Sequence, residues 1–144
     1  MIETGPLRPE DRAAWEVLAR RYKTFYRESE PDEAYEQTWR RLAAGTELFG
    51  LGARLDGRLV GIAHYFFHPA VWSGEACYLQ DLFTDEAARG RGAARALIEA
   101  VAAAARERGA DRFYWHTQES NARARVLYDK VARFTGFIRY AYPL

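Results

Sequence analysis

The sequence has little cysteine, no long apolar run and no excess of either charge. Cys77 is the only cysteine, so the chain can form no internal disulfide and no multi-cysteine metal cluster. Lysine and arginine total 21 against 20 aspartate and glutamate residues, and this balance argues against a dedicated nucleic-acid-binding protein. The longest apolar stretch, around Ala100–Ala105, is far shorter than a membrane span, and the N-terminus has no signal-peptide pattern. These absences predict a cytoplasmic protein that binds neither nucleic acid nor membrane.

Apolar and aromatic residues are plentiful. Hydrophobic residues make up 49% of the chain and aromatic residues 15%, which is enough to build a buried core. A chain of 144 residues has room for one domain and no more. No internal repeat or linker divides the sequence. We therefore expect a single domain over residues 1–144.

Hydrophobic periodicity predicts a mixed α+β domain. Apolar residues recur at helical spacing in four segments, and Asp56-Gly57 is a two-residue hairpin signal between two extended runs. The expected helices span Pro9–Arg27, Asp32–Ala44, Gly90–Arg108 and Asn121–Thr135, and the expected strands span Ile2–Leu7, Leu48–Leu55, Leu59–His68, Ala76–Thr84, Arg112–Thr117 and Phe137–Tyr142. This order predicts one sheet with helices on both faces.

The first motif with chemical content is a glycine-rich turn, Arg89-Gly90-Arg91-Gly92-Ala93-Ala94, between a strand and a helix. A helix start presents unpaired N–H groups and a positive dipole end, and glycines let the backbone close on an anion. A P-loop would need Lys-Ser/Thr after Gly92, and a dinucleotide motif would need a small residue at Arg95. The turn therefore indicates a pyrophosphate held by successive amides. On the residues alone, an ordinary loop before a helix with a basic start is an equally good interpretation.

A second motif lies on the following helix. Asn121, Ala124 and Tyr128 fall on one side of that helix, and Gly136-Phe137 follows it. Asn121 could simply cap the helix, and Tyr128 could simply be a core tyrosine. Both structural alternatives stay open until the two motifs are considered together.

Together these motifs resemble those of the GNAT superfamily of acetyl-CoA-dependent N-acetyltransferases. The matching residues are Leu82-Phe83-Thr84, the turn from Arg89 to Ala94, Asn121…Ala124…Leu127-Tyr128 and Gly136-Phe137. A wider pattern is similar to the acetyltransferase group associated with histones, polyamines and D-amino acids. It comprises Trp15…Tyr22…Phe25-Tyr26…Pro31-Asp32, Asp81-Leu82-Phe83 and Thr117-x-Glu119-Ser120-Asn121-x-Arg123-Ala124. A shorter pattern, Tyr78-Leu79-x-Asp81-x-Phe83, is similar to spermidine/spermine acetyltransferases.

The resemblance implies a mostly antiparallel central sheet with helices on both faces. It also implies that the strand ending at Thr84 and the strand Arg112–Thr117 splay apart, leaving a wedge for pantetheine. Members of the superfamily often form homodimers, and the last strand, Phe137–Tyr142, is the expected interface element. The acceptor is expected to be a small-molecule or peptide amine.

Acetyl-CoA is the co-substrate that the resemblance implies, with no metal. Main-chain groups around Leu82 and Thr84 would pair with the pantetheine arm, and the glycine turn would hold the pyrophosphate. The implied cofactor-binding residues are Leu82, Phe83, Thr84, Arg89, Gly90, Arg91, Gly92, Ala93, Ala94 and Asn121. Thr84 replaces a commoner valine and Ala94 a commoner glycine, but both contacts use the backbone.

The implied reaction is direct attack of an amine on the thioester, with no acyl-enzyme. The N–H of Leu82 is the expected oxyanion donor and Tyr128 the expected general acid. Gln80 stands where polyamine enzymes have a glutamate, and an amide cannot take a proton. Asp81 is the remaining candidate base, although strand alternation points it to the opposite face unless a bulge intervenes. Either Asp81 acts through water, or a water chain carries the proton with no single base.

The acceptor is expected to lie against the helix–loop–helix before the sheet. Acidic residues there suit a cationic amine, although a solvated acidic loop would show the same composition. The expected substrate-binding residues are Phe25, Tyr26, Glu28, Glu30 and Gln80. We expect a polyamine or other small amine as acceptor. A protein lysine, an amino acid, or a non-catalytic acyl-CoA-binding domain are the alternatives, and Tyr128 argues against the last.

Two other residue types are given structural roles. His64 and His68 lie four residues apart on a strand, roughly 13 Å, which is too far to share a metal. His116 is expected to face out from its strand, with a proton-relay role as a weaker alternative. Cys77 is expected to be a buried structural thiol.

Overall fold

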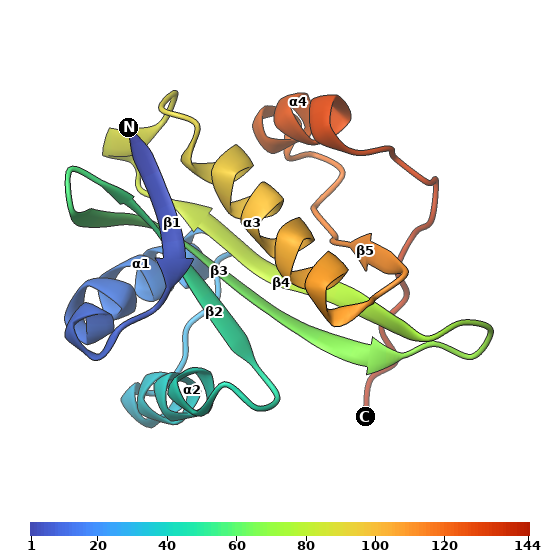
Figure 1. Cartoon of the computed structure of the whole chain (residues 1–144), viewed down its shortest axis with the longest axis horizontal. Coiled ribbons are helices and arrows are strands. Elements are labelled where there is room, and N and C mark those ends of the chain that lie inside the picture. The colour runs from blue at the N-terminus through green and yellow to red at the C-terminus, as the bar shows by residue number, and fades with distance from the viewer.

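In the computed structural model, which describes residues 1–144, the chain forms one five-stranded sheet with helices on both faces (Figure 1). The strands lie in chain order: β1 (Ile2–Pro6), β2 (Phe49–Leu55), β3 (Arg58–Pro69), β4 (Glu75–Thr84) and β5 (Arg112–Tyr114). The first four pair antiparallel, and β5 runs parallel to β4. The predicted mixed, mostly antiparallel sheet is confirmed.

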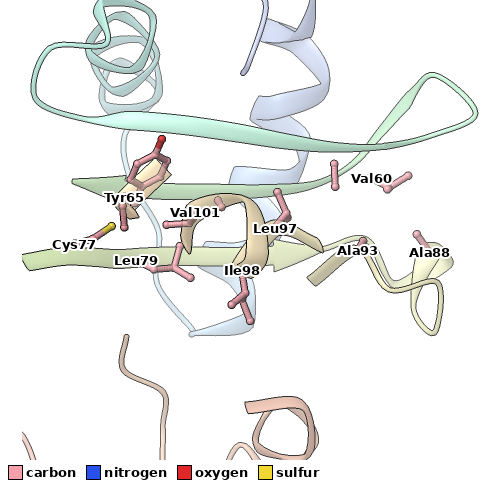
Figure 2. Close-up of a cluster of buried hydrophobic side chains, with 12 residues drawn as sticks. Val60, Tyr65, Cys77, Leu79, Ala88, Ala93, Leu97, Ile98 and Val101 are labelled. Carbon is pink, nitrogen blue, oxygen red and sulfur yellow. The ribbon is translucent and has the colours of Figure 1, made fainter. Parts of the chain in front are cut away.

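Four α-helices cover the sheet: α1 (Arg12–Phe25), α2 (Asp32–Ala44), α3 (Ala93–Arg108) and α4 (Ala122–Val131). On one face, α1 and α2 pack around Trp15 and Ile62. On the other face, α3 lays Leu97 and Val101 against β3 and β4, as Figure 2 shows. No helix has the combination of length and apolar composition that a membrane span requires.

A β-bulge at Gln80 decides which way the end of β4 faces. Tyr65 of β3 opposes Leu79, and the next residue back along β3, His64, opposes Asp81, so Gln80 is an extra residue in β4. Leu79 packs in the cluster beneath α3, whereas Asp81 hydrogen-bonds His64 on the α1 side. The bulge thus turns the side chain of Asp81 to the face of the sheet on which the acceptor is expected to bind.

The strands β4 and β5 separate, as predicted. They pair only from Ala76 with Arg112 to Tyr78 with Tyr114, while β4 continues to Thr84. The predicted strand Arg112–Thr117 therefore ends three residues early. The β-bulge at Gln80 lies two residues beyond the last paired residue, Tyr78, so β4 changes its course close to where the two strands separate. The outer edge of β4 is left open beyond this point.

The last predicted strand, Phe137–Tyr142, is wrong. Residues 133–144 form neither helix nor strand, and α4 ends at Val131 rather than continuing to Thr135. The segment runs past β5 to the end of the chain without joining the sheet (Figure 1). A strand needs a neighbouring edge for its backbone groups, and no edge of this chain pairs with the segment.

Candidate active site

The glycine turn opens into free space. Gly90 and Gly92 have φ values of 78° and 84°, in the left-handed region that glycine adopts without strain. A Cβ added at either position would meet no atom within 4 Å. A side chain there would therefore occupy space beside the turn rather than collide with the protein.

The amides of this turn have no partners in the chain. The N–H groups of Gly90, Gly92, Ala93 and Ala94 donate no hydrogen bond, and the first bond of α3 runs from the N–H of Ala96 to the carbonyl of Gly92 at 3.0 Å. They lie at the positive end of a helix of 16 residues. Several free donors converging at a helix N-terminus fit the oxygens of a diphosphate.

Two arginines add positive charge beside these amides. Arg89 meets only the exposed carboxylate of Glu86, at 3.5 Å, and Arg91 is exposed. At the end of β4, Thr84 keeps its hydroxyl oxygen buried without a hydrogen-bond partner. Phe83 packs against Tyr22 of α1, so its side chain points away from the gap and only its backbone faces β5.

Asn121 caps α4, as the alternative interpretation of this residue predicts. Its side-chain oxygen accepts from the N–H of Ala124 at 3.4 Å, and its amide nitrogen donates to Thr117 at 3.1 Å. Both polar ends are engaged within the chain. A contact between Asn121 and the pantetheine arm stays a prediction.

Tyr128 lies in a narrow cavity of about 20 Å³ at the mouth of the opened strands, together with Leu82 and Trp115. Its ring meets the ring of Trp115 edge-on, with centroids 5.4 Å apart. Burial, with a smaller contribution from Tyr26, raises the pKa of Tyr128 to about 12. The phenol therefore keeps its proton at neutral pH. The structure brings together the predicted acid and the predicted oxyanion donor.

A larger cavity of about 750 Å³ lies between α1, α2 and the sheet. Tyr22 and Gln80 line both this cavity and the narrow one, so the two adjoin at these residues. Ionisable side chains of both signs line the larger cavity: Lys23, Arg41, Arg108, Glu30, Glu47 and Asp81. Cations and anions therefore both face this cavity.

Asp81 directly follows Gln80, which lines both cavities, and itself lines the larger one. Its Oδ2 lies 2.9 Å from Nδ1 of His64. Burial would raise the pKa of Asp81, but the hydrogen bonds with His64 and with the hydroxyl of Tyr22 and the charge of Lys23 together hold it below its ordinary value. The carboxylate is therefore ionised at neutral pH.

The predicted acceptor residues are only partly brought together. Glu30 and Gln80 line the larger cavity and Tyr26 the narrow one, while Phe25 and Glu28 line neither. The acidic cluster is also partly neutralised, because the ammonium group of Lys23 lies 3.5 Å from Glu28 and 3.6 Å from Glu30. Less negative charge faces the cavity than the sequence suggests.

The sequence argument missed His64 as a partner of Asp81, because it considered His64 only as a metal ligand. Among the other candidates, Cys77 is buried as predicted, and burial raises the pKa of its thiol to about 11. His116 bonds the hydroxyl of Tyr78 at 3.2 Å and lines the narrow cavity. No group of three or more histidine, cysteine or acidic side chains is placed to hold a metal ion.

A sheet opened between two parallel strands, with unpaired amides at the next helix and a half-buried phenol in the gap, fits an acyltransferase that uses a diphosphate-bearing thioester. The chain belongs to the acetyltransferase (GNAT) family, whose model matches residues 14–134. It is an N-acetyltransferase, as the resemblance in its sequence implies.

The relatives support this assignment over nearly the full length. The chain is 37% identical over 143 residues to the D-amino-acid N-acetyltransferase HPA3 of Saccharomyces cerevisiae, covering 96% of this chain and 89% of that protein. A ribosomal-protein-alanine N-acetyltransferase from Brucella melitensis biovar Abortus 2308 is 25% identical and superposes with a TM-score of 0.82, covering 100% and 99% of the two chains. The aminoglycoside N-acetyltransferase AAC(6')-Iy, solved with CoA, shares the fold at 18% identity, with a TM-score of 0.87 over 99% and 95%.

Proposed function

We propose that the chain acetylates the primary amine of a small, amino-acid-like molecule by direct attack on the thioester of acetyl-CoA. The observation that carries this proposal is the pair of adjoining cavities, one lined by Leu82 and Tyr128 and the other by Asp81 and Lys23. In the reaction a nitrogen–carbon bond forms and a carbon–sulfur bond breaks. The acceptor ammonium loses two protons in all, of which the thiolate takes one and solvent the other.

The residues present fit acetyl-CoA, which supplies an acetyl group activated as a thioester. The free amides from Gly90 to Ala94, with the charges of Arg89 and Arg91, hold the diphosphate. The open edge of β4 at Leu82–Thr84 gives the pantetheine arm backbone partners, as a further strand would.

Leu82 and Tyr128 act on the reacting atoms. The backbone N–H of Leu82 stabilises the negative charge that develops on the carbonyl oxygen. The hydroxyl of Tyr128 donates a proton to the departing sulfur, because burial keeps the phenol protonated until it is needed. The phenolate then regains a proton from the attacking nitrogen, so Tyr128 is unchanged after each turnover. Asp81 receives the ammonium group of the acceptor, whose first proton passes to water.

An acceptor carrying a carboxylate fits the larger cavity better than a polyamine does. Three cations, Lys23, Arg41 and Arg108, line it as partners for an anion, and the pairing of Lys23 with Glu28 and Glu30 lowers the negative charge that a polycation would need. The relationship to a D-amino-acid N-acetyltransferase supports the same choice. A polyamine remains the second acceptor to assay.

The acceptor proposal predicts a loss specific to carboxylate-bearing substrates in Lys23→Met. We expect kcat/KM for an amino acid to fall about tenfold to a hundredfold, since one charge-assisted hydrogen bond is lost. For the matched amine without a carboxylate it should not fall. Release of free thiol from acetyl-CoA measures both, with the exposed Lys130→Met as control. Wild-type preference for polyamines over amino acids would refute this acceptor class.

We also propose that two copies associate through the C-terminal segment, residues 137–144. Its large apolar side chains are almost fully exposed, with Phe137 at 86%, Tyr140 at 88% and Tyr142 at 85%. Beside the segment lies β5, which pairs only with β4 and has a free outer edge. Around a twofold axis, each segment can lie along the β5 edge of the other copy and bury these side chains.

The association predicts a dimer whose formation depends on this segment. Light scattering should give twice the chain mass of 16.5 kDa for the wild type. Replacing Ile138 and Tyr140 together by aspartate should give the single mass, since charge would prevent their burial. The exposed Val71→Asp, in the turn between β3 and β4, is the control and should leave the dimer intact. A wild-type monomer would overturn the proposal.

A further inference from the structure

A chain of three hydrogen-bonded side chains ends at the larger cavity. Trp15 of α1 donates from Nε1 to Nε2 of His64 at 2.9 Å, and Nδ1 of His64 lies 2.9 Å from Oδ2 of Asp81. Trp15 is 1% exposed and belongs to the core between α1, α2 and the sheet. All three side chains line the larger cavity.

The hydrogen bonds that join Trp15, His64 and Asp81 can form together in only one protonation state of His64. The indole nitrogen of Trp15 is a donor and never an acceptor, so Nε2 of His64 must present its lone pair. A neutral imidazole with a free lone pair on Nε2 carries its proton on Nδ1, which then donates to Asp81. Both ring nitrogens of His64 are thereby engaged, which leaves neither to act as a base.

We propose that Trp15 holds His64 as the neutral Nδ1–H tautomer, and that His64 thereby fixes the ionised Asp81 carboxylate as the binding site for the acceptor's ammonium group. The inference rests on the proposed function and deepens it. Trp15 and His64 are positioning residues, and Asp81 is the residue that touches the substrate.

The groups around Asp81 favour its ionised form. They are His64 from β3 and Tyr22 and Lys23 from α1. The hydrogen bond from Trp15 requires the neutral imidazole, because a proton on Nε2 would remove the lone pair that accepts from the indole.

This arrangement places the amine where the reaction occurs. Free alkyl amines arrive as ammonium ions, since their ordinary pKa is near 10.4. An ammonium bound at Asp81 lies beside Tyr22 and Gln80, the two residues that line both cavities. It therefore faces the narrow cavity in which Tyr128 stands. The bulge at Gln80 is what sets Asp81 in this position.

The protonation state of His64 can be measured without acceptor or acetyl-CoA. Nitrogen NMR of the imidazole at neutral pH should show the neutral Nδ1–H tautomer of His64. Trp15→Phe keeps an aromatic ring and removes the donor. In this variant the proton should no longer be confined to Nδ1, so the nitrogen shifts of His64 should move, and KM for the amine should rise. A charged His64 or an Nε2–H tautomer in the wild type would overturn the proposal, as would unchanged nitrogen shifts in Trp15→Phe.

A second variant tests the ammonium site itself. Asp81→Asn keeps the shape and removes the charge, so we expect KM for the amine to rise about tenfold to a hundredfold. The affinity for acetyl-CoA should stay the same, and the exposed Asp129→Asn is the matched control. An unchanged KM in Asp81→Asn would overturn the proposal. Failure of the proposed function would show differently, as no thiol release from any amine while His64 stays neutral.

Discussion

Tyr128→Phe is expected to lower kcat about a hundredfold while leaving the affinity for acetyl-CoA unchanged. The variant keeps the ring that packs on Trp115 and removes only the hydroxyl, so the narrow cavity retains its shape. General acids contribute about a hundredfold or more when the leaving group must be protonated. Because the pKa of Tyr128 is raised to about 12, its ionisation should cause no loss of wild-type kcat at any pH well below that value.

The matched control for this variant is Tyr114→Phe. Tyr114 is a half-exposed tyrosine whose hydroxyl bonds His68 at 2.8 Å and which lines neither cavity. Its loss should not change kcat. If Tyr128→Phe retained the wild-type rate and a variant of His116 lost it, the proton would come from His116, which lines the same narrow cavity.

Gly92→Val is expected to weaken acetyl-CoA binding about tenfold to a hundredfold, which corresponds to one lost charge-assisted hydrogen bond. Gly92 has a φ of 84°, and its added side chain would project into the space beside the free amides. A branched side chain at positive φ also destabilises the fold by roughly 1–2 kcal/mol or more. Calorimetry of acetyl-CoA binding therefore needs a control that shares the strain.

Gly109→Val supplies that control. Gly109 caps the opposite end of α3 with a φ of 85°, and it too has no atom within 4 Å of an added Cβ. Both variants should lose similar thermal stability, but only Gly92→Val should lose affinity. Gly92→Ala, with a smaller side chain, should lie between Gly92→Val and the wild type. Equal affinities in Gly92→Val and Gly109→Val would show that the diphosphate binds elsewhere.

Much of the fold follows from local sequence signals. The hairpin signal at Asp56-Gly57 joins β2 and β3, and Gly109 ends α3 in the left-handed conformation that glycine favours. The glycine turn could also be predicted, because free amides at a helix start depend only on local geometry. Its two glycines moved the start of α3 to Ala93, since a helix cannot include their positive φ values.

The acceptor side could not be predicted, because it depends on one extra residue in a strand. Without the bulge at Gln80, the pairing of Tyr65 with Leu79 would continue to His64 with Gln80. Asp81 would then face α3, since side chains alternate along a strand. No single residue of β4 signals the bulge, so the partnership of His64 and Asp81 appears only in the folded sheet.

The C-terminal segment shows that a strand-like composition does not by itself predict a strand. Residues Phe137–Tyr142 have the composition of a strand, but composition does not supply an edge to pair with. Within one chain these residues stay exposed. The second copy that we propose would cover them.

The central claim is that the free amides at the start of α3 hold a diphosphate and so place a thioester beside Tyr128. The most direct test is a crystal structure of the chain with CoA. The account predicts phosphate oxygens about 3 Å from the N–H groups of Gly92, Ala93 and Ala94, with the sulfur next to the hydroxyl of Tyr128. A diphosphate bound away from this turn, or a Tyr128 hydroxyl directed away from the sulfur, would contradict it.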